Sequence, residues 1–300
     1  MTDQQSTEVV DIAVVGGGPA GLSAATWAAR YRRSVVVLDS GEYRAASVDR
    51  SHGYLGRDPQ RPVDLIAEGR KELAAYSTAS LRETTVTSIR QRDGLFEVGE
   101  HRARRVVLAC GVRDAVPELE GFAEHYGASA FHCASCDGYE ARDRHVVALG
   151  WGDQVAGFAE SLLNWASSVT VLTDGHAFTA ADADARERLA ARGVAVVEEQ
   201  ASALLGRRGD LQGLRLVSGD RLDAGLLFFS IAHRPQTALA VSLGCELDED
   251  GYVRISECGQ TSVEGVYAAG DLVPGLQLVS VAAASGTVAG VAAAQSLTEH

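Results

Sequence analysis

The feature that most constrains the fold is a strand and a glycine-rich turn near the amino terminus. Val9–Val15 is a short apolar run, mostly β-branched, which indicates a buried parallel strand. It runs directly into Gly16-Gly17-Gly18-Pro19-Ala20-Gly21, which matches the pattern G-x-G-x-x-G. Such a turn lets the backbone approach a pyrophosphate at the start of the next helix. The segment therefore predicts a nucleotide site.

The residues after this turn complete the same unit. Leu22–Arg30 is rich in alanine and predicts a helix, and Ser34–Leu38 predicts the next strand. Asp39 ends that strand about twenty residues past the glycines, where an acid would accept hydrogen bonds from ribose hydroxyls. The candidate cofactor-binding residues here are Gly16, Gly18, Pro19, Ala20, Gly21, Asp39 and Ser40.

A second, poorer copy of the unit lies in the middle of the chain. His145–Leu149 predicts a strand, Gly150-Trp151-Gly152-Asp153-Gln154-Val155 a glycine turn, and Ser168–Leu172 another strand, with Asp174 as the terminal acid. Val155 replaces the third glycine, and Trp151 adds bulk where a cofactor would pass. Two interpretations stay open: a working nicotinamide site at Gly150, Gly152 and Asp174, or a retained fold without tight binding. Two such units predict an α/β protein with two Rossmann-like domains.

Between the two units lies a pair of cysteines two residues apart, in Cys133-Ala134-Ser135-Cys136-Asp137-Gly138. Such a pair can close a small disulfide ring and so store and release two electrons. Zinc would need further ligands, but the sequence has no second C-x-x-C, and Cys110, Cys245 and Cys258 are isolated. We therefore predict a redox pair and no metal site.

Composition limits the partners and the compartment. The net charge of −13 argues against nucleic acid and anionic membranes, both of which demand clustered Lys and Arg. We find no signal peptide and no run of eighteen apolar residues, which predicts a cytoplasmic protein. Five cysteines at irregular spacing do not make a secreted disulfide framework.

Other segments also bear on the fold. Leu81–Arg90 predicts a single strand, and Asp93-Gly94 a tight turn between it and the next strand, Leu95–Val98. Tyr252–Ile255 predicts another short strand, and Val279–Leu297 the final helix. Residues 41–64 have no apolar period; a loop this long beside a nucleotide site either contacts the ligand or is a plain surface loop.

Taken in order, these motifs resemble the low-molecular-weight thioredoxin reductases, over nearly the whole chain. Residues 16–21 are similar to the FAD turn of that family, and residues 133–138 to its redox motif. Residues 232–237 (Ala-His-Arg-Pro-Gln-Thr) resemble the segment that returns the chain to the FAD domain, and residues 261–271, ending in Gly270-Asp271, the stretch whose aspartate holds FAD.

The resemblance implies two Rossmann-like domains, the second inserted into the first. Residues 1–115 and 242–300 would form a discontinuous FAD-binding domain, and residues 116–241 an NAD(P)-binding-like domain carrying the C-x-x-C. It also implies a homodimer, with a thioredoxin-like protein or a small dithiol or disulfide as the partner. The cofactor contacts that complete the set are Arg44, His52, Gly111, Gly270, Asp271, Gln277 and Leu278.

The resemblance further implies roles for the redox motif. Cys136 would face the flavin, Cys133 would exchange with the sulfur of the substrate, and Asp137 would be the acid–base group. General chemistry agrees, because the thiolate is the reactive form and a proton must be supplied to, or removed from, the leaving sulfur. The activity expected is FAD-dependent thiol–disulfide exchange, with electrons passed to a disulfide substrate.

Two departures from the family pattern keep NAD(P)H uncertain and leave a second activity open. Residues 173–176 (Thr-Asp-Gly-His) lack the arginines that clamp the 2′-phosphate of NADPH, and Asp174 would repel that phosphate. Residues 41–55 look like the branch of the family that includes gliotoxin-type dithiol oxidases. There a small dithiol reduces the cysteines and oxygen removes the electrons, and His52 or His132 is a candidate base.

Overall fold

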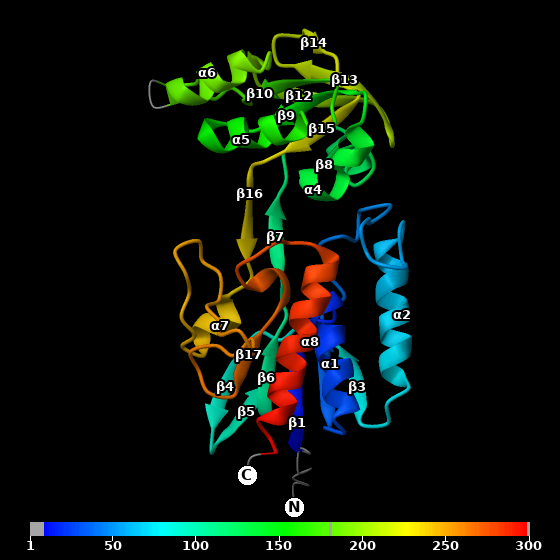
Figure 1. Cartoon of the computed structure of the whole chain (residues 1–300), viewed down its shortest axis with the longest axis vertical. Coiled ribbons are helices and arrows are strands. Elements are labelled where there is room, and N and C mark those ends of the chain that lie inside the picture. The colour runs from blue at the N-terminus through cyan, green and yellow to red at the C-terminus, as the bar shows by residue number, and fades with distance from the viewer. Residues whose placement is uncertain (1–8, 180–181, 299–300) are drawn as a thin grey trace, which may run out of the picture.

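The computed structural model describes residues 9–179 and 182–298. Figure 1 shows two α/β domains, one above the other, joined by a pair of extended strands. The lower, first domain contains both ends of the described chain. The upper, second domain is built from the middle of the sequence.

The first domain is built on a seven-stranded sheet in the order β3-β2-β1-β6-β5-β4, with β17 also paired to β6. The central strands are parallel, whereas β4 and β5 form an antiparallel hairpin at one edge. β17 is parallel to the second half of β6. The strands are β1 (Val9–Val15), β2 (Val35–Asp39), β3 (Ala79–Glu83), β4 (Ile89–Arg92), β5 (Leu95–Val98), β6 (His101–Leu108) and β17 (Val266–Ala268).

Two helices pack closely together against this sheet, α1 (Pro19–Arg30) and α8 (Val279–Gln295) (Figure 1). Small residues make the close packing possible. A Cβ atom added at Gly286 would lie 2.0 Å from the carbonyl oxygen of Ala20, and one at Gly290 would lie 2.3 Å from that of Ala24. The domain also contains α2 (Pro62–Ala74), α7 (Ala238–Ser242) and a 3-10 turn at Gly270–Leu272.

The second domain has a five-stranded parallel sheet in the order β11-β10-β9-β15-β8 and a three-stranded antiparallel sheet, β12-β13-β14. The parallel strands are β8 (Ala130–Phe131), β9 (His145–Leu149), β10 (Ser168–Leu172), β11 (Ala195–Val197) and β15 (Leu226–Phe229). The others are β12 (Ala201–Arg207), β13 (Asp210–Leu216) and β14 (Arg221–Leu222). The helices are α3 (Phe122–His125), α4 (Ala134–Asp137), α5 (Gly152–Leu162) and α6 (Ala183–Ala191), with a 3-10 turn at Gly138–Ala141.

The connection between the domains is a two-stranded antiparallel ribbon of β7 (Val112–Ala115) and β16 (Ala232–Pro235) (Figure 1). β7 follows directly from the first sheet and leads the chain upward, and β16 brings it back. Asp114 and His233 are directly opposed in this ribbon. The residue boundaries of the domains stay a prediction.

The predicted fold class is confirmed, since the structure is α/β with two separate sheets whose central strands are parallel. Strand β1 has the predicted bounds, and the turn at Asp93-Gly94 has two residues of positive φ, +51° and +74°, as a tight hairpin requires. Among the described residues, no helix has the length and apolar character needed to cross a membrane.

Two strand predictions are wrong. The single strand predicted at Leu81–Arg90 is two strands, because β3 continues the parallel edge beside β2 while β4 belongs to the hairpin at the opposite edge of the sheet. The strand predicted at Tyr252–Ile255 is an irregular segment in which only Val253 makes a bridge, to Leu247. Both errors arise because an apolar period does not show which neighbouring strand is available for pairing.

Candidate active site

A cavity of about 1740 Å³ brings the first glycine turn and the cysteine pair together. Residues from both domains and from the ribbon line it. From the predicted sites, the lining includes Gly16, Gly18, Pro19, Ala20, Asp39, Ser40, Arg44, His52, Gly111, Cys133, Cys136, Asp137, Gly270, Asp271, Gln277 and Leu278. Cavity and cysteines together therefore form the best candidate for a reaction site.

The first glycine turn has the shape of a phosphate cradle. Gly16 has a φ of +104°, and a Cβ atom there would lie 2.4 Å from the carbonyl oxygen of Ala109. Gly21 does not line the cavity; a Cβ on it would lie 1.8 Å from the carbonyl oxygen of Gly16. Gly18, in contrast, has nothing within 4 Å of where its Cβ would be. Gly16 and Gly21 thus allow the turn to pack tightly, whereas Gly18 leaves its backbone open to a ligand.

Asp39 lies at the end of β2 and is almost fully buried. Its carboxylate accepts hydrogen bonds from the backbone N–H of Gly17 at 3.1 Å, from Arg70 Nη2 at 2.6 Å and from the hydroxyl of Tyr43. Burial by itself would raise the pKa of Asp39, but the bonds from Tyr43 and Arg70 outweigh it and hold the pKa below its ordinary value. The fingerprint acid is therefore ionised and firmly positioned beside the turn.

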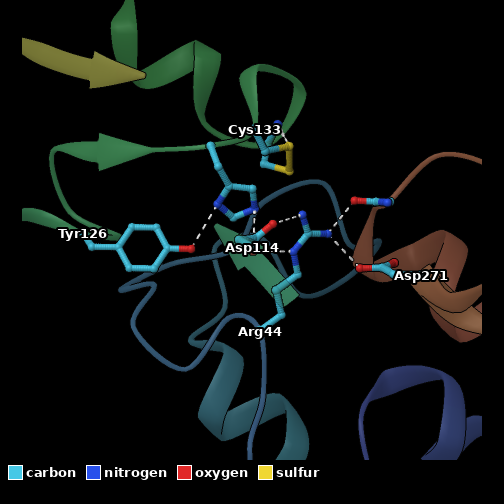
Figure 2. Close-up of a disulfide and its surroundings, with 8 residues drawn as sticks. Arg44, Asp114, Tyr126, Cys133 and Asp271 are labelled. Atoms are coloured by element: carbon cyan, nitrogen blue, oxygen red, sulfur yellow. Dashed lines mark hydrogen bonds and ion pairs between the residues drawn. A yellow bond between two sulfur atoms is a disulfide. The ribbon is translucent and has the colours of Figure 1, made fainter. Parts of the chain in front are cut away.

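The cysteines of the redox motif form a disulfide, Cys133–Cys136, across the first turn of α4. The backbone N–H of Cys136 donates to Sγ of Cys133 at 3.1 Å. Both cysteines are partly exposed and open into the cavity. Figure 2 shows the disulfide above the side chains that link the two domains. A backbone donor at Sγ of Cys133 stabilises negative charge there whenever the disulfide opens.

Asp137 follows the disulfide directly and is 7% exposed. Burial, together with the charge of Glu140, raises the pKa of Asp137 to about 7, whereas His52 acts in the opposite direction. A carboxyl with a pKa near 7 can both donate and accept a proton at neutral pH. The chain therefore places an acid–base group next to the sulfur pair.

A chain of polar side chains joins the two domains beneath the disulfide (Figure 2). Arg44 binds both oxygens of Asp114 with its Nε and Nη2 atoms, at 2.8 and 2.6 Å. Its Nη1 donates to Asp271 Oδ2 at 2.9 Å and to Gln277 Oε1 at 2.7 Å. Burial would lower the pKa of Arg44, but Asp114 and Asp271 together raise it, so the guanidinium stays charged. Arg44 thus connects the ribbon to the Gly-Asp motif.

His132 completes this chain on the side of the second domain. Its Nε2 lies 3.7 Å from Asp114 Oδ2, and its Nδ1 lies 3.2 Å from the hydroxyl of Tyr126. Burial lowers the pKa of His132 to about 4, although the charge of Asp114 acts against it. The imidazole is therefore neutral at pH 7, so Tyr126 can donate to Nδ1 while Nε2–H points to Asp114.

The second glycine turn differs from the first in its packing. Val155 is fully buried, and a Cβ atom added at Gly150 would lie 3.1 Å from its Cγ2 atom. The ring of Trp151 stacks on that of His176, with centroids 4.1 Å apart. Asp174 has a φ of +53° and accepts a hydrogen bond from the backbone of Ala201 at 3.2 Å. Gly150, Gly152 and Asp174 thus lie in the second domain and do not line the cavity.

Three residues around the site have no signal in the sequence. Tyr43 holds Asp39 from a loop and Arg70 holds it from α2, and Asp114 lies in β7 of the ribbon. Their roles depend on contacts between distant parts of the chain. Of the charged residues in the long loop, Arg44 and His52 were identified by resemblance alone.

Comparison with known proteins agrees with these features. Residues 10–286 match the family described as pyridine nucleotide-disulphide oxidoreductase. The chain is 30% identical to thioredoxin reductase tcpT of Claviceps purpurea, an alignment that covers 97% of this chain and 95% of that protein. It is also 30% identical to the thioredoxin reductase of Treponema pallidum, over 95% of this chain and 96% of that one.

Solved structures show the same relationship. The crystal structure of HlmI has a TM-score of 0.90 and 33% identity, covering 97% of this chain and 93% of that chain. A putative thioredoxin reductase TrxB from Bacillus anthracis has a TM-score of 0.89 and 29% identity, covering 97% and 99%. The predicted family and enzyme class are confirmed: the chain belongs to the pyridine nucleotide-disulphide oxidoreductases and is a flavoprotein disulfide oxidoreductase of the thioredoxin reductase type.

Proposed function

We propose that FAD binds in the shared cavity and exchanges two electrons with the Cys133–Cys136 pair. One observation carries this proposal: the first glycine turn and the disulfide line the same cavity. Residues 16–20 would hold the pyrophosphate, Asp39 the ribose, and Asp271 the ribityl and phosphate region. The open position at Gly18 and the buried, ionised carboxylate of Asp39 fit such a ligand. When bound, FAD gives or takes an electron pair, which is what opening or closing a disulfide requires.

The side chains of the redox motif then perform the thiol exchange. To reduce a substrate, the thiolate of Cys133 attacks one sulfur of the substrate disulfide, and the other substrate sulfur leaves with a proton. The thiolate of Cys136 next attacks Sγ of Cys133, which releases the second substrate thiol and forms the Cys133–Cys136 disulfide again. Asp137 supplies or removes protons, because its pKa of about 7 suits both directions.

A second candidate activity is dithiol oxidation, in which the same steps run in reverse and oxygen takes the electrons. It is supported by the second glycine turn, where Val155 fills the place of a glycine and Trp151 stacks on His176. The positive side chain of Arg188, near this turn, is already paired, since it lies 3.0 Å from Asp153 and 3.4 Å from Glu160. Val155 and Trp151 disfavour tight binding of any nicotinamide, and Asp174, which would repel a 2′-phosphate, disfavours NADPH relative to NADH. A homodimer and a cytoplasmic location stay predictions.

Anaerobic mixing of the FAD-loaded protein tests both activities. We expect dithiothreitol to bleach the flavin absorbance in either case, and Cys136→Ser to abolish that bleaching. A protein that dithiothreitol does not bleach would contradict the proposed electron exchange. Rapid bleaching by NADH or NADPH would support the reductase. No bleaching by either nucleotide, with oxygen uptake when a dithiol is added in air, would support the oxidase.

A further inference from the structure

The loop between β2 and α2 leaves the first domain and reaches the second (Figure 1). It meets the turn that joins β12 to β13, where Arg208 lies. Nη2 of Arg208 donates to the carbonyl oxygen of Ser47 at 3.1 Å and to Asp49 Oδ1 at 2.6 Å. One guanidinium nitrogen of the second domain thus binds two groups of the first.

The other side of the same guanidinium is fixed within the second domain. Nη1 of Arg208 donates to the carbonyl oxygens of Glu124 at 2.8 Å and of Tyr126 at 3.3 Å. These bonds hold the arginine in the geometry that reaches across to the loop. A planar fork with fixed donors loses little freedom when it makes the additional contacts.

Backbone contacts surround the arginine. The backbone N–H of Asp49 donates to the carbonyl oxygen of Gly127 at 3.0 Å. Gly127 lies so close to the loop that a Cβ atom on it would be 2.2 Å from the carbonyl oxygen of Ser47. Further along the loop, His52 Nε2 lies 3.4 Å from Oε1 of Glu140, three residues past Asp137. The loop therefore contacts residues of the second domain that precede the redox motif in the chain and residues that follow it.

These contacts bear on which molecules can reach the sulfurs. Cys133 and Cys136 are partly buried and open into a cavity whose far wall is the first domain. A folded protein partner needs the redox motif on a free surface, whereas a small thiol or disulfide can reach a sulfur that lies inside a cavity. We propose that Arg208 is a specificity-determining residue, which holds the domains closed over the cavity and so favours small thiols and disulfides over protein ones. This inference rests on the proposed thiol exchange.

The strength of this closure is limited. The side chains of Arg208 and Asp49 are 39% and 57% exposed, and exposed ion pairs contribute little by themselves. Loss of Arg208 would remove both its ion pair with Asp49 and its hydrogen bond to the Ser47 carbonyl. We expect this loss to shift the balance between closed and open domain arrangements roughly tenfold toward the open one. The closed state is therefore favoured but can be opened, and a substitution of Arg208 should be measurable without unfolding the chain.

Size-selective alkylation tests the closure directly. We compare Arg208→Ala with Arg207→Ala, its neighbour in the same turn, which pairs only within its own hairpin, with Asp210. Each FAD-loaded protein is reduced anaerobically and treated with iodoacetamide or with a maleimide carrying a polyethylene glycol chain. Mass spectrometry then measures modification of the tryptic peptide 114–142, which contains both redox cysteines and excludes Cys110, Cys245 and Cys258.

We expect the bulky reagent to be slow on the original protein and on Arg207→Ala, and about tenfold faster on Arg208→Ala, with iodoacetamide unchanged. Asp49→Ala should resemble Arg208→Ala, and the double variant should add little to either. Equal rates for Arg207→Ala and Arg208→Ala would overturn the inference. So would a bulky reagent that modifies the original protein as fast as iodoacetamide does.

A second measurement compares substrates. Anaerobic bleaching of the flavin is followed with dithiothreitol and with a reduced thioredoxin, and Arg208→Ala should speed only the thioredoxin reaction. A thioredoxin rate that is the same in both arginine variants would contradict the inference. Failure of dithiothreitol to bleach the flavin of the original protein would instead contradict the proposed function, and the alkylation result would still decide on the closure.

Discussion

Gly21 packs directly against the carbonyl oxygen of Gly16, so that a Cβ atom on Gly21 would lie 1.8 Å from it. This contact fixes the first glycine turn, because the start of α1 can approach the end of β1 only if that position has no side chain. The same turn leaves the backbone at Gly18 open to the cavity. One short segment thus provides both the close packing of α1 on β1 and an open backbone that a ligand can approach.

Substituting Gly21→Ala should therefore destabilise the protein and prevent it from retaining FAD. Overpacking at this backbone contact should cost about 1–3 kcal/mol of unfolding free energy. Thermal unfolding and the flavin content after gel filtration measure the two effects. Gly157→Ala in α5 is the matched control, because nothing lies within 4 Å of its Cβ position. That variant should retain FAD and be slightly more stable.

Asp137→Asn should make the protein more stable above neutral pH. The folded pKa of Asp137 is raised to about 7, so its contribution to stability is present at acid pH and is lost as the pH rises from about 4 through 7. Asparagine keeps the shape without the buried charge, and the gain at pH 8 should be roughly 1–4 kcal/mol. Urea unfolding at pH 5 and pH 8 measures it. Asp143→Asn, which alters a 90% exposed side chain nearby, should show no such gain.

The same substitution should slow thiol exchange. Removing a positioned acid–base group commonly costs 10²-fold to 10⁴-fold in rate, so we expect Asp137→Asn to reduce the rate of flavin bleaching by dithiothreitol by about 10²-fold or more. Asp143→Asn should retain the original rate. An Asp137→Asn variant that is as fast as the original protein at pH 7 would show that another group moves the proton.

Replacing the cysteines one at a time should separate their roles. If Cys136 faces the flavin, Cys133→Ser should keep or enhance the long-wavelength absorbance of a thiolate beside the flavin, whereas Cys136→Ser should abolish it. Absorbance spectra of the purified variants from pH 6 to pH 9 measure this. The opposite pattern would exchange the roles assigned to the two sulfurs.

Arg70→Leu should destabilise the first domain, because it leaves the buried carboxylate of Asp39 with fewer donors. Asp39 has a lowered folded pKa, so its stabilising contribution is present above pH 4 and is lost as the pH falls through the folded pKa. We expect a loss of about 1–3 kcal/mol at pH 7 that is smaller at pH 3. Arg61→Leu, on an exposed side chain at the start of the same helix, is the control and should change unfolding little.

Much of the local structure follows from the sequence. The runs Val9–Val15 and His145–Leu149 form strands with those bounds, because an apolar β-branched run ending in glycine has few other solutions. The single strand predicted at Leu81–Arg90 fails because the chain crosses there from one edge of the sheet to the other. Nothing in the residues themselves marks that crossing, since both halves have strand-like composition.

The candidate site could likewise be predicted from the sequence only in part. The glycine turns and the C-x-x-C are recognisable because their chemistry depends on the spacing of neighbouring residues. The partners of Asp39 and of Asp114 are not, because Arg70 and Arg44 reach them only when the chain is folded. Arg208 likewise has no signal in the sequence, since its contacts with the loop depend on how one domain lies against the other.

The sequence by itself determined the two nucleotide-type units, the redox cysteines and the family, because each rests on a short pattern whose geometry is local. Only the tertiary structure decided that the first turn and the disulfide share one cavity, and that Arg44 binds both Asp114 and Asp271, which lie 70 and 227 residues from it along the chain. The physical reason is that such contacts come from the packing of whole domains, which brings together side chains that no local preference relates.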